Sequence, residues 1–267
     1  MKTINPKKIF RFWHLIAFLF FLYPQSIFPT PSQDRPAMTN QDFRNALDLW
    51  FADEADARQA HGPIGDWNVS KVTSMNKAFK NRTQFNEDIS DWNVSSVRDM
   101  AFMFEGATSF DQDIGDWDVS SVTVMQGMFM RASSFDQDIG DWNVSKVVNA
   151  IQLFSQAQSF NSVLSEWDLS SVRNLSLIFD RASSFNQPIG NWDLSSVSNM
   201  SGVFNGAVSF NQPIGNWNVS SITNMTAAFQ GATSFNQDIG SWDVSSVLSF
   251  RNTFKNASSF NQSLANW

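Results

Sequence analysis

Carboxylate side chains that recur every 25 residues are the first feature of this sequence with chemical potential. Each stands directly before a tryptophan, and the five members, which we call the acidic column, are Asp66, Asp91, Asp116, Asp141 and Glu166. If neighbouring members lie ~5 Å apart on adjacent chain segments, their charges repel one another. The acidic column therefore favours a counter-cation or a basic partner.

Two further polar columns accompany the tryptophans. The residue after each tryptophan is Asn or Asp, which defines the Asx column of Asn68, Asn93, Asp118, Asn143, Asp168, Asp193, Asn218 and Asp243. Two residues further on, every unit from Ser70 to Ser245 carries a serine. Together these columns predict a concave face suited to sugar hydroxyls or to weak calcium binding. In the alternative reading, the Asn, Asp and Ser ladders stabilise the stack and the acids keep the surface soluble.

The acids of both columns give a candidate partner-binding strip. Its members are Asp66, Asp91, Asp116, Asp141, Glu166, Asp118, Asp168 and Asp193. The expected partner is a protein or a glycan, which the sequence does not identify further.

Catalysis and bound cofactors are not predicted. Residues 111–118 superficially resemble a calcium-binding loop, but the spacing and terminal Glu of an EF-hand are absent. A carboxylate pair can act as acid and base in a glycoside hydrolase or lyase, yet here the acids recur as near-equivalent copies. We therefore expect no enzyme, no catalytic residue, no metal and no cofactor, with calcium as a weak alternative.

The composition excludes several other classes of protein. The 267 residues contain no Cys and two His, which removes disulfide scaffolds, thiolate nucleophiles and iron–sulfur clusters. A net charge of −7 with scattered Lys and Arg argues against a nucleic-acid partner. A count of 11 Trp and 26 Phe beside one Tyr indicates that a few core positions are copied many times.

The copying is a strict period of 25 residues that runs from Trp67 to Trp267 without insertion or deletion. Two phenylalanine columns keep the same period, one from Phe79 to Phe254 and one from Phe85 to Phe260. Eight complete units result. Such a period indicates a stack in which each unit buries its apolar face against its neighbours.

The spacing within a unit predicts one strand and one helix. Ile114-x-x-Trp117-x-Val119 matches the frame of a leucine-rich repeat, with a short strand at Trp-x-Val. A stripe of apolar residues with helical spacing follows: Val122, Met125, Met128, Phe129 and Ala132. We therefore expect an α/β fold, a right-handed leucine-rich-repeat-like solenoid of about eight strand-helix units with a parallel sheet.

The repeated string resembles a known family. Residues 185–200, Phe-Asn-Gln-Pro-Ile-Gly-Asn-Trp-Asp-Leu-Ser-Ser-Val-Ser-Asn-Met, are similar to the repeats of the BspA-like leucine-rich repeat surface proteins, long classed as a domain of unknown function. The resemblance covers about residues 62–267, and the unit at 142–166 departs most from the pattern. It implies an exported or surface-displayed protein with a binding or adhesion role and without catalysis.

The two ends of the repeat array differ. Residues 39–60 predict an N-terminal capping helix, preceded by Thr39 and with Phe43, Leu47 and Trp50 on one face. The last unit has no comparable cap, so Phe254 and Phe260 should lie near an open edge. Either the chain continues, or this edge associates with a partner or a second copy.

The first residues predict export. A basic start and an apolar run ending at Pro24 are typical of a secretory signal peptide, here residues 1–32, with an uncleaved signal anchor as the alternative. Its removal leaves 14 basic against 25 acidic residues, a net charge of −11. Residues 33–61 then form a linker and cap, and residues 62–267 form the repeats.

Export makes N-glycosylation a further expectation, with Asn81, Asn174 and Asn256 as candidate sites among ten sequons. The leading functional hypothesis is a secreted or cell-surface binding module without catalysis. Its alternatives are an architectural, self-assembling surface component and, less favoured, a glycan-active enzyme with a carboxylate pair.

Overall fold

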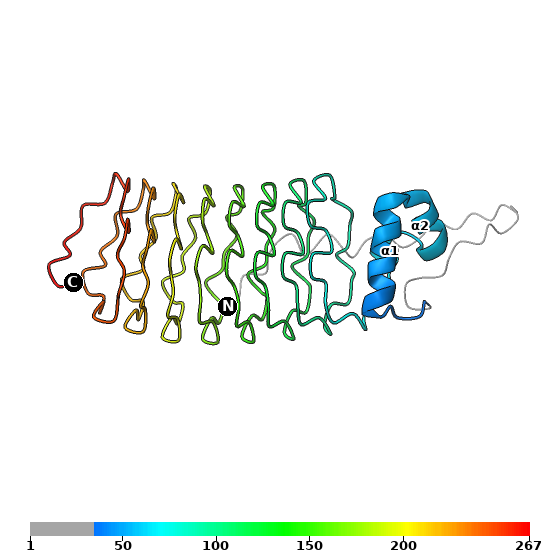
Figure 1. The fold of residues 1–267 in the computed structure, drawn as a ribbon, viewed down its shortest axis with the longest axis horizontal. Coiled ribbons are helices and arrows are strands. Elements are labelled where there is room, and N and C mark those ends of the chain that lie inside the picture. Colours follow the sequence, from blue (N-terminus) through cyan, green and yellow to red (C-terminus); the bar gives the residue numbers. More distant parts are fainter. Residues whose placement is uncertain (1–34) are drawn as a thin grey trace, which may run out of the picture. The chain divides into compact units, whose positions relative to one another are not determined.

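The computed structural model describes residues 35–267, which lie within one unit and share one continuous hydrophobic core. A chain segment with its own core of this kind can fold independently. Each repeat forms one coil of the chain. The coils stack in a row that begins beside the two N-terminal helices (Figure 1). The predicted signal peptide at 1–32 lies outside the described residues.

The described chain begins with two helices and a short 3-10 turn. Helix α1 spans Asn40–Ala52, α2 spans Glu54–His61 and η3 spans Ile64–Asp66. The structure therefore has two helices where the sequence predicts one over 39–60. The division falls at Asp53, whose extended φ of −151° ends α1 and whose Oδ1 accepts the Asp56 N–H at 3.1 Å.

Helix α1 covers the apolar edge of the first coil. The hydroxyl of Thr39 accepts the Asp42 N–H while the Asp42 carboxylate accepts the Thr39 N–H, so both ends of a capping box are formed. The ring of Trp50 then meets that of Trp67 edge-on at 5.8 Å between centroids, and Phe43 meets it at 6.4 Å. Aromatic contacts of this geometry bind the cap to the first coil.

The expected strand-helix α/β solenoid is wrong. Between residues 67 and 267 the structure contains turns and isolated parallel bridges, with neither a helix nor a continuous strand. The leucine-rich-repeat frame predicted for each unit is therefore absent from the described coils. What survives of the prediction is the stacking of one unit per 25 residues.

Consecutive tight turns replace the expected helix. In residues 75–82, the Ala78 N–H donates to the Met75 carbonyl at 3.1 Å, which closes a four-residue turn. The N–H of Lys77 instead donates to Ala101 of the next coil at 3.0 Å, and that of Phe79 donates to Met103 at 2.8 Å. Alternate amides thus serve the turn and the neighbouring coil, whereas an α-helix would use them all internally.

Positive φ angles explain why a helix cannot form here. Lys77 and Asn81 have φ of 60° and 59°, each at the third position of a turn, as in a type II turn. The same two positions have positive φ in every later coil: Phe102, Gly127, Gln152, Leu177, Gly202, Ala227 and Asn252, then Gly106, Arg131, Gln156, Arg181, Gly206, Gly231 and Asn256. An α-helix requires negative φ throughout. Successive turns nevertheless bury residues at a spacing close to that of a helix. This is why the apolar pattern of the sequence predicted a helix where the structure has turns.

The parallel pairing falls elsewhere than predicted. Single bridges join residues seven positions after each tryptophan, such as Ser74 with Asp99, rather than the Trp-x-Val segments. Along the described stack this series is interrupted between Asn149 and Asn174. The interruption lies in the unit at 142–166, which departs most in sequence and has Ala150 where other units have a larger apolar residue.

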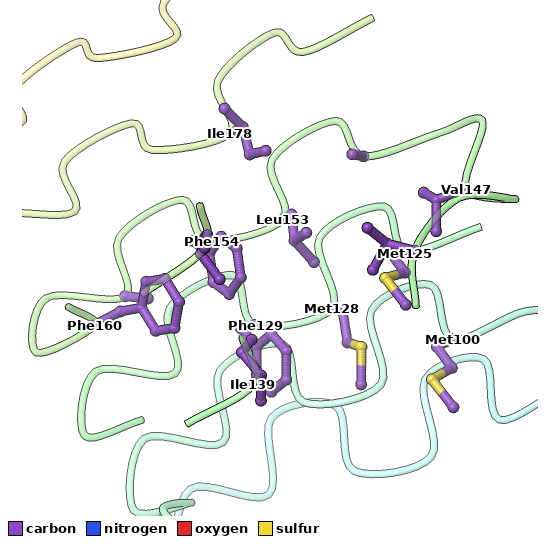
Figure 2. Close-up of a cluster of buried hydrophobic side chains, with 14 of the residues drawn as sticks. Met100, Met125, Met128, Phe129, Ile139, Val147, Leu153, Phe154, Phe160 and Ile178 are labelled. Carbon is purple, nitrogen blue, oxygen red and sulfur yellow. The ribbon is translucent and has the colours of Figure 1, made fainter. Parts of the chain in front are cut away.

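Stacked aromatic rings fill the inside of the coils. The ring centroid of Phe129 lies 4.0 Å from that of Phe135 in the same coil and 5.7 Å from that of Phe154 in the next coil. The rings are nearly parallel in both pairs. Figure 2 shows the rings of Phe129 and Phe154 in the interior of the stack, with Met128 near Phe129. The tryptophans are at most 4% exposed from Trp67 to Trp242, so the prediction that they belong to the core is confirmed.

Loss of one ring should cost much of the stability of the stack. Phe129 is fully buried, so Phe129→Ala removes its contacts with both neighbouring coils and should lower the free energy of unfolding by about 3–5 kcal/mol. The measurement is urea denaturation followed by tryptophan fluorescence. Val148, which is 50% exposed, provides the control, because Val148→Ala should change stability by less than about 0.5 kcal/mol. Equal effects of the two variants would contradict this account of the core.

Candidate functional site

The acidic column lies in a tight turn at the surface of each coil. The turn is closed by the tryptophan, as where the Trp117 N–H donates to the Ile114 carbonyl at 3.2 Å. All five carboxylates of the column are exposed. In the described hydrogen bonds and ion pairs, the carboxylates of Asp66, Asp91 and Asp116 take no part, so the frame of the coil does not use them.

Glycines precede three of the five acids, Asp66, Asp116 and Asp141, and allow the coils to approach one another there. A Cβ built on Gly115 would lie 2.5 Å from the carbonyl oxygen of Asp138 in the next coil, closer than side chains tolerate. A Cβ on Gly65 would meet the carbonyl oxygen of Asp88 at the same distance. The acids are therefore held at the interval set by backbone packing.

Two shallow depressions lie along the first members of the column. One of about 270 Å³ is lined by Pro63, Ile64, Gly65, Asp66, Glu87, Asp88 and Asp91. A second of about 320 Å³ is lined by Gly65, Trp67, Asn68, Val69, Ser70, Asp91 and Asn93. Asp91 borders both, so the structure brings Asp66 and Asp91 of the predicted strip to one hollow. Asp118, Asp168 and Asp193 line neither of them.

The Asx column has a structural role. Asn93 Oδ1 accepts both the N–H and the hydroxyl of Ser95, at 3.1 and 2.6 Å, which closes a small turn after the tryptophan. Asp118 accepts the Ser120 N–H at 3.0 Å in the same manner. These hydrogen bonds, led by the one from the serine side chain, lower the pKa of Asp118, Asp168, Asp193 and Asp243 below the usual value.

Sequence reasoning missed a ladder that joins the coils on another side. The residue after the second phenylalanine of each coil accepts, through its side-chain oxygen, the N–H of its equivalent in the next coil. Seven such bonds of 2.7–3.0 Å run without a break through Asn86, Asp111, Asp136, Asn161, Asn186, Asn211, Asn236 and Asn261. The recurrence of Asn or Asp at this position was the available signal.

The tryptophan side chains also join the coils. Each indole N–H from Trp92 onwards donates to the backbone carbonyl of the Ile or Leu 28 residues earlier, at 2.9–3.2 Å. The acceptor belongs to the preceding coil. Buried tryptophans therefore add one hydrogen bond per coil to the stack.

A buried acid was likewise not foreseen in the turn ribbon, the segment of consecutive turns at residues 75–82 and its equivalents in later coils. Glu105 is 3% exposed, and its carboxylate pairs with Lys80 of the preceding coil at 2.7 Å and with Arg131 of the following coil at 2.5 Å. Two cations compensate the burial of one charge, as a buried carboxylate requires. This cluster links three coils and contains no exposed acid that a ligand would reach.

The structure also bears on metal binding and on the candidate N-glycosylation sites. Within residues 35–267 no group of three or more His, Asp or Glu side chains is arranged to hold a metal ion. Glu87, beside the first depression, pairs with Arg58 of α2 at 3.5 Å. Among the candidate glycosylation sites, Asn81 and Asn256 are exposed, whereas Asn174 is half-buried and its Oδ1 accepts the Ser176 N–H at 2.9 Å.

A sequence profile of the family described as Mycoplasma protein of unknown function, DUF285, matches residues 46–167 and again residues 152–267. The two matches cover most of the chain, so the protein belongs to this family of repeat proteins. A comparison with curated proteins found no match. No helix among the described residues is long and apolar enough to cross a membrane.

The Asx column gives stability a pH dependence. Because hydrogen bonds lower the folded-state pKa of Asp118, Asp168, Asp193 and Asp243, their contribution is present above the unfolded value of about 3.9 and is lost as the pH falls through the folded value. Replacing all four by Asn, which occupies this column elsewhere, should reduce the stability lost between about pH 5 and pH 2.5. Urea denaturation at both pH values measures this.

The corresponding alanine variant separates charge from geometry. Asp118→Ala removes the acceptor for Ser120, so it should lower stability at neutral pH, whereas Asp118→Asn keeps the turn. An unchanged acid-induced loss in the fourfold Asn variant would show that these carboxylates do not carry the pH dependence.

Proposed function

We propose that the protein is exported and serves at the cell surface or outside the cell as a binding and adhesion module without catalysis. The likeness to BspA-like surface proteins and the apparent leader at 1–32 support export. The acidic column supports the binding role. It is the one observation on which the binding role rests.

Three members of the acidic column, Asp66, Asp91 and Asp116, are exposed and take no part in the hydrogen bonds that hold the coils. Carboxylates in the Asx column and in the inter-coil ladder, by contrast, are engaged in hydrogen bonds of the fold. A partner can therefore engage the acidic column without disturbing the stack.

The arrangement of the column favours an extended partner. Neighbouring carboxylates recur at the interval of the coils, and the hollows beside Asp66 and Asp91 are shallow and open. Like charges spaced by ~5 Å repel, and a partner that supplies cationic groups or hydrogen-bond donors relieves this repulsion. A glycan or protein that lies along the stack fits these requirements better than a small molecule, which needs an enclosing pocket.

Removal of the exposed charges should weaken binding. The variant carries Asp66→Asn, Asp91→Asn and Asp116→Asn. Asparagine is native at the same repeat position in later coils, as Asn191 and Asn216. On a glycan array and against basic proteins, with and without calcium, we expect affinity for any bound partner to fall about tenfold or more. The measurement compares dissociation constants with the wild type.

A matched variant controls for net charge. Asp118→Asn, Asp168→Asn, Asp193→Asn removes the same number of charges from the Asx column, where Asn is also native. It should leave affinity nearly unchanged. Equal losses in both variants would mean that overall charge, and not the acidic column, governs binding.

Export is tested separately. Residues 1–32 fused to a reporter that is active only outside the cytoplasm should direct its export, and the exported protein should begin near residue 33 by mass spectrometry. A reporter that stays inside the cell would overturn the proposed location. A product that is exported but retains residues 1–32 would identify the segment as an anchor.

A further inference from the structure

The acids and the bases of the repeats occupy different parts of the 25-residue unit. The acidic half runs from the residue after the second phenylalanine to the residue after the tryptophan, as in 111–118, and the basic half covers positions four to fifteen after the tryptophan, as in 121–132. Of the 19 acids in residues 62–267, 16 lie in acidic halves, while all 11 bases lie in basic halves. No base of these residues lies in an acidic half.

Three acids lie in basic halves, and one of them, Glu105, pairs with the bases Lys80 and Arg131. Glu105 and Asp180 are buried, at 3% and 8% exposure. Asp99 is half-buried, and its carboxylate accepts the Ala101 N–H at 2.9 Å. By contrast, ten of the 11 bases are exposed. The apolar columns fill the inside of each coil, so the two halves are separate stretches of its outer surface, one rich in acids and one rich in bases. They come close at one boundary, where Lys146 acts on the charge of Asp118.

We propose that the acidic side of one copy binds the basic side of a second copy, so that the stacks associate laterally. The positions on both sides repeat once per coil. Two stacks lying side by side therefore present their charges at the same interval, the distance between neighbouring coils. The ring centroids of Phe110 and Phe135 in adjacent coils lie 5.9 Å apart, which illustrates that interval on the inside of the coil. A second copy thus offers opposite charge at a matching period, which is electrostatic complementarity over an extended surface.

The distribution along the stack specifies the direction. Of the 16 acids in acidic halves, 13 lie in residues 66–168, and nine of the 11 bases lie in residues 71–182. Two copies that run parallel place these charged portions side by side. An antiparallel pair would set the charged portion of one copy against the nearly neutral coils of the other. The association is therefore parallel, with the α1 ends of both copies together, and it is heterologous, so that more copies can add.

This inference uses the acidic column on which the proposed function rests, and names a second copy as its partner. Its test needs no external ligand. Residues 33–267, the unit with its own core, are studied by analytical ultracentrifugation at low salt and at about 0.5 M salt, where charges are screened beyond a few Å. We expect mass to rise with concentration at low salt and to return to that of a monomer at high salt.

Complementary charge reversals make the test specific. One variant carries Lys77→Glu, Arg98→Glu and Arg173→Glu, and the other carries Asp91→Lys, Asp116→Lys and Glu166→Lys; all six native residues are exposed. Each variant alone should associate much more weakly than the wild type, because its altered side no longer complements its unaltered side. In an equimolar mixture the unaltered acidic side of one variant meets the unaltered basic side of the other, so association at low salt should be restored toward that of the wild type. Circular dichroism and tryptophan fluorescence establish that each variant is folded.

The direction is read by energy transfer. The chain has no Cys, so Asn45→Cys, on the exposed face of α1, gives a single labelling position. Transfer between donor- and acceptor-labelled copies should be efficient in the parallel arrangement, whereas little transfer in the associated state would overturn it.

The failures of the two proposals are distinguishable. A wild type that stays monomeric at low salt, or a mixture of folded variants that does not associate, overturns lateral association and leaves external binding by the acidic column intact. Association of the mixture while dilute monomers bind no external partner overturns the binding role and retains this inference.

Discussion

The division of backbone amides between turn and neighbouring coil is the constraint on which the whole structure depends. In each turn ribbon, backbone N–H groups alternate between two kinds of acceptor. The Ala78 N–H closes a turn by donating to the Met75 carbonyl, and the neighbouring Lys77 N–H donates to the Ala101 carbonyl of the following coil. No coil can satisfy its buried backbone alone, so each requires the next. The positive φ angles at Lys77 and Asn81 follow from this division.

The side chains extend the same principle of sharing between coils. The indole of Trp117 donates to the Ile89 carbonyl in the preceding coil, and Asn86 accepts the Asp111 N–H in the following one. Phenylalanine rings stack across the same interface, as Phe129 does on Phe154. Because these contacts repeat in every coil, an insertion in one unit would break all of them at that point, which accounts for the unvarying period.

Much of this organisation could be predicted from the sequence, and one part could not. The period, the burial of the tryptophans and the exposure of the acids follow from which columns are apolar and which are polar. The expected helix failed because Val122, Met125 and Met128 have a spacing that consecutive turns also produce. Glycine at two positions of the ribbon, as at Gly106 and Gly127, was the visible sign of positive φ, but other units place Phe102 or Arg131 there. Tertiary hydrogen bonds overcome the local preference of those residues, and a single sequence does not reveal them.

The candidate site could be located from the sequence only in part, because residue type does not distinguish structural from available carboxylates. Asp116 and Asp118 flank the same tryptophan and are both exposed, yet Asp118 closes a turn with Ser120 and Asp116 does not. At the position of Asp116, later coils carry Asn191 and Asn216 without any change in the fold. Charge in the acidic column is thus separable from the frame that holds it. Asp66, Asp91 and Asp116, which the hydrogen bonds of the coils do not use, can therefore change without cost to the fold. The carboxylates of the acidic column are concentrated in the first coils, opposite in sign to the bases on the other half of the same coils.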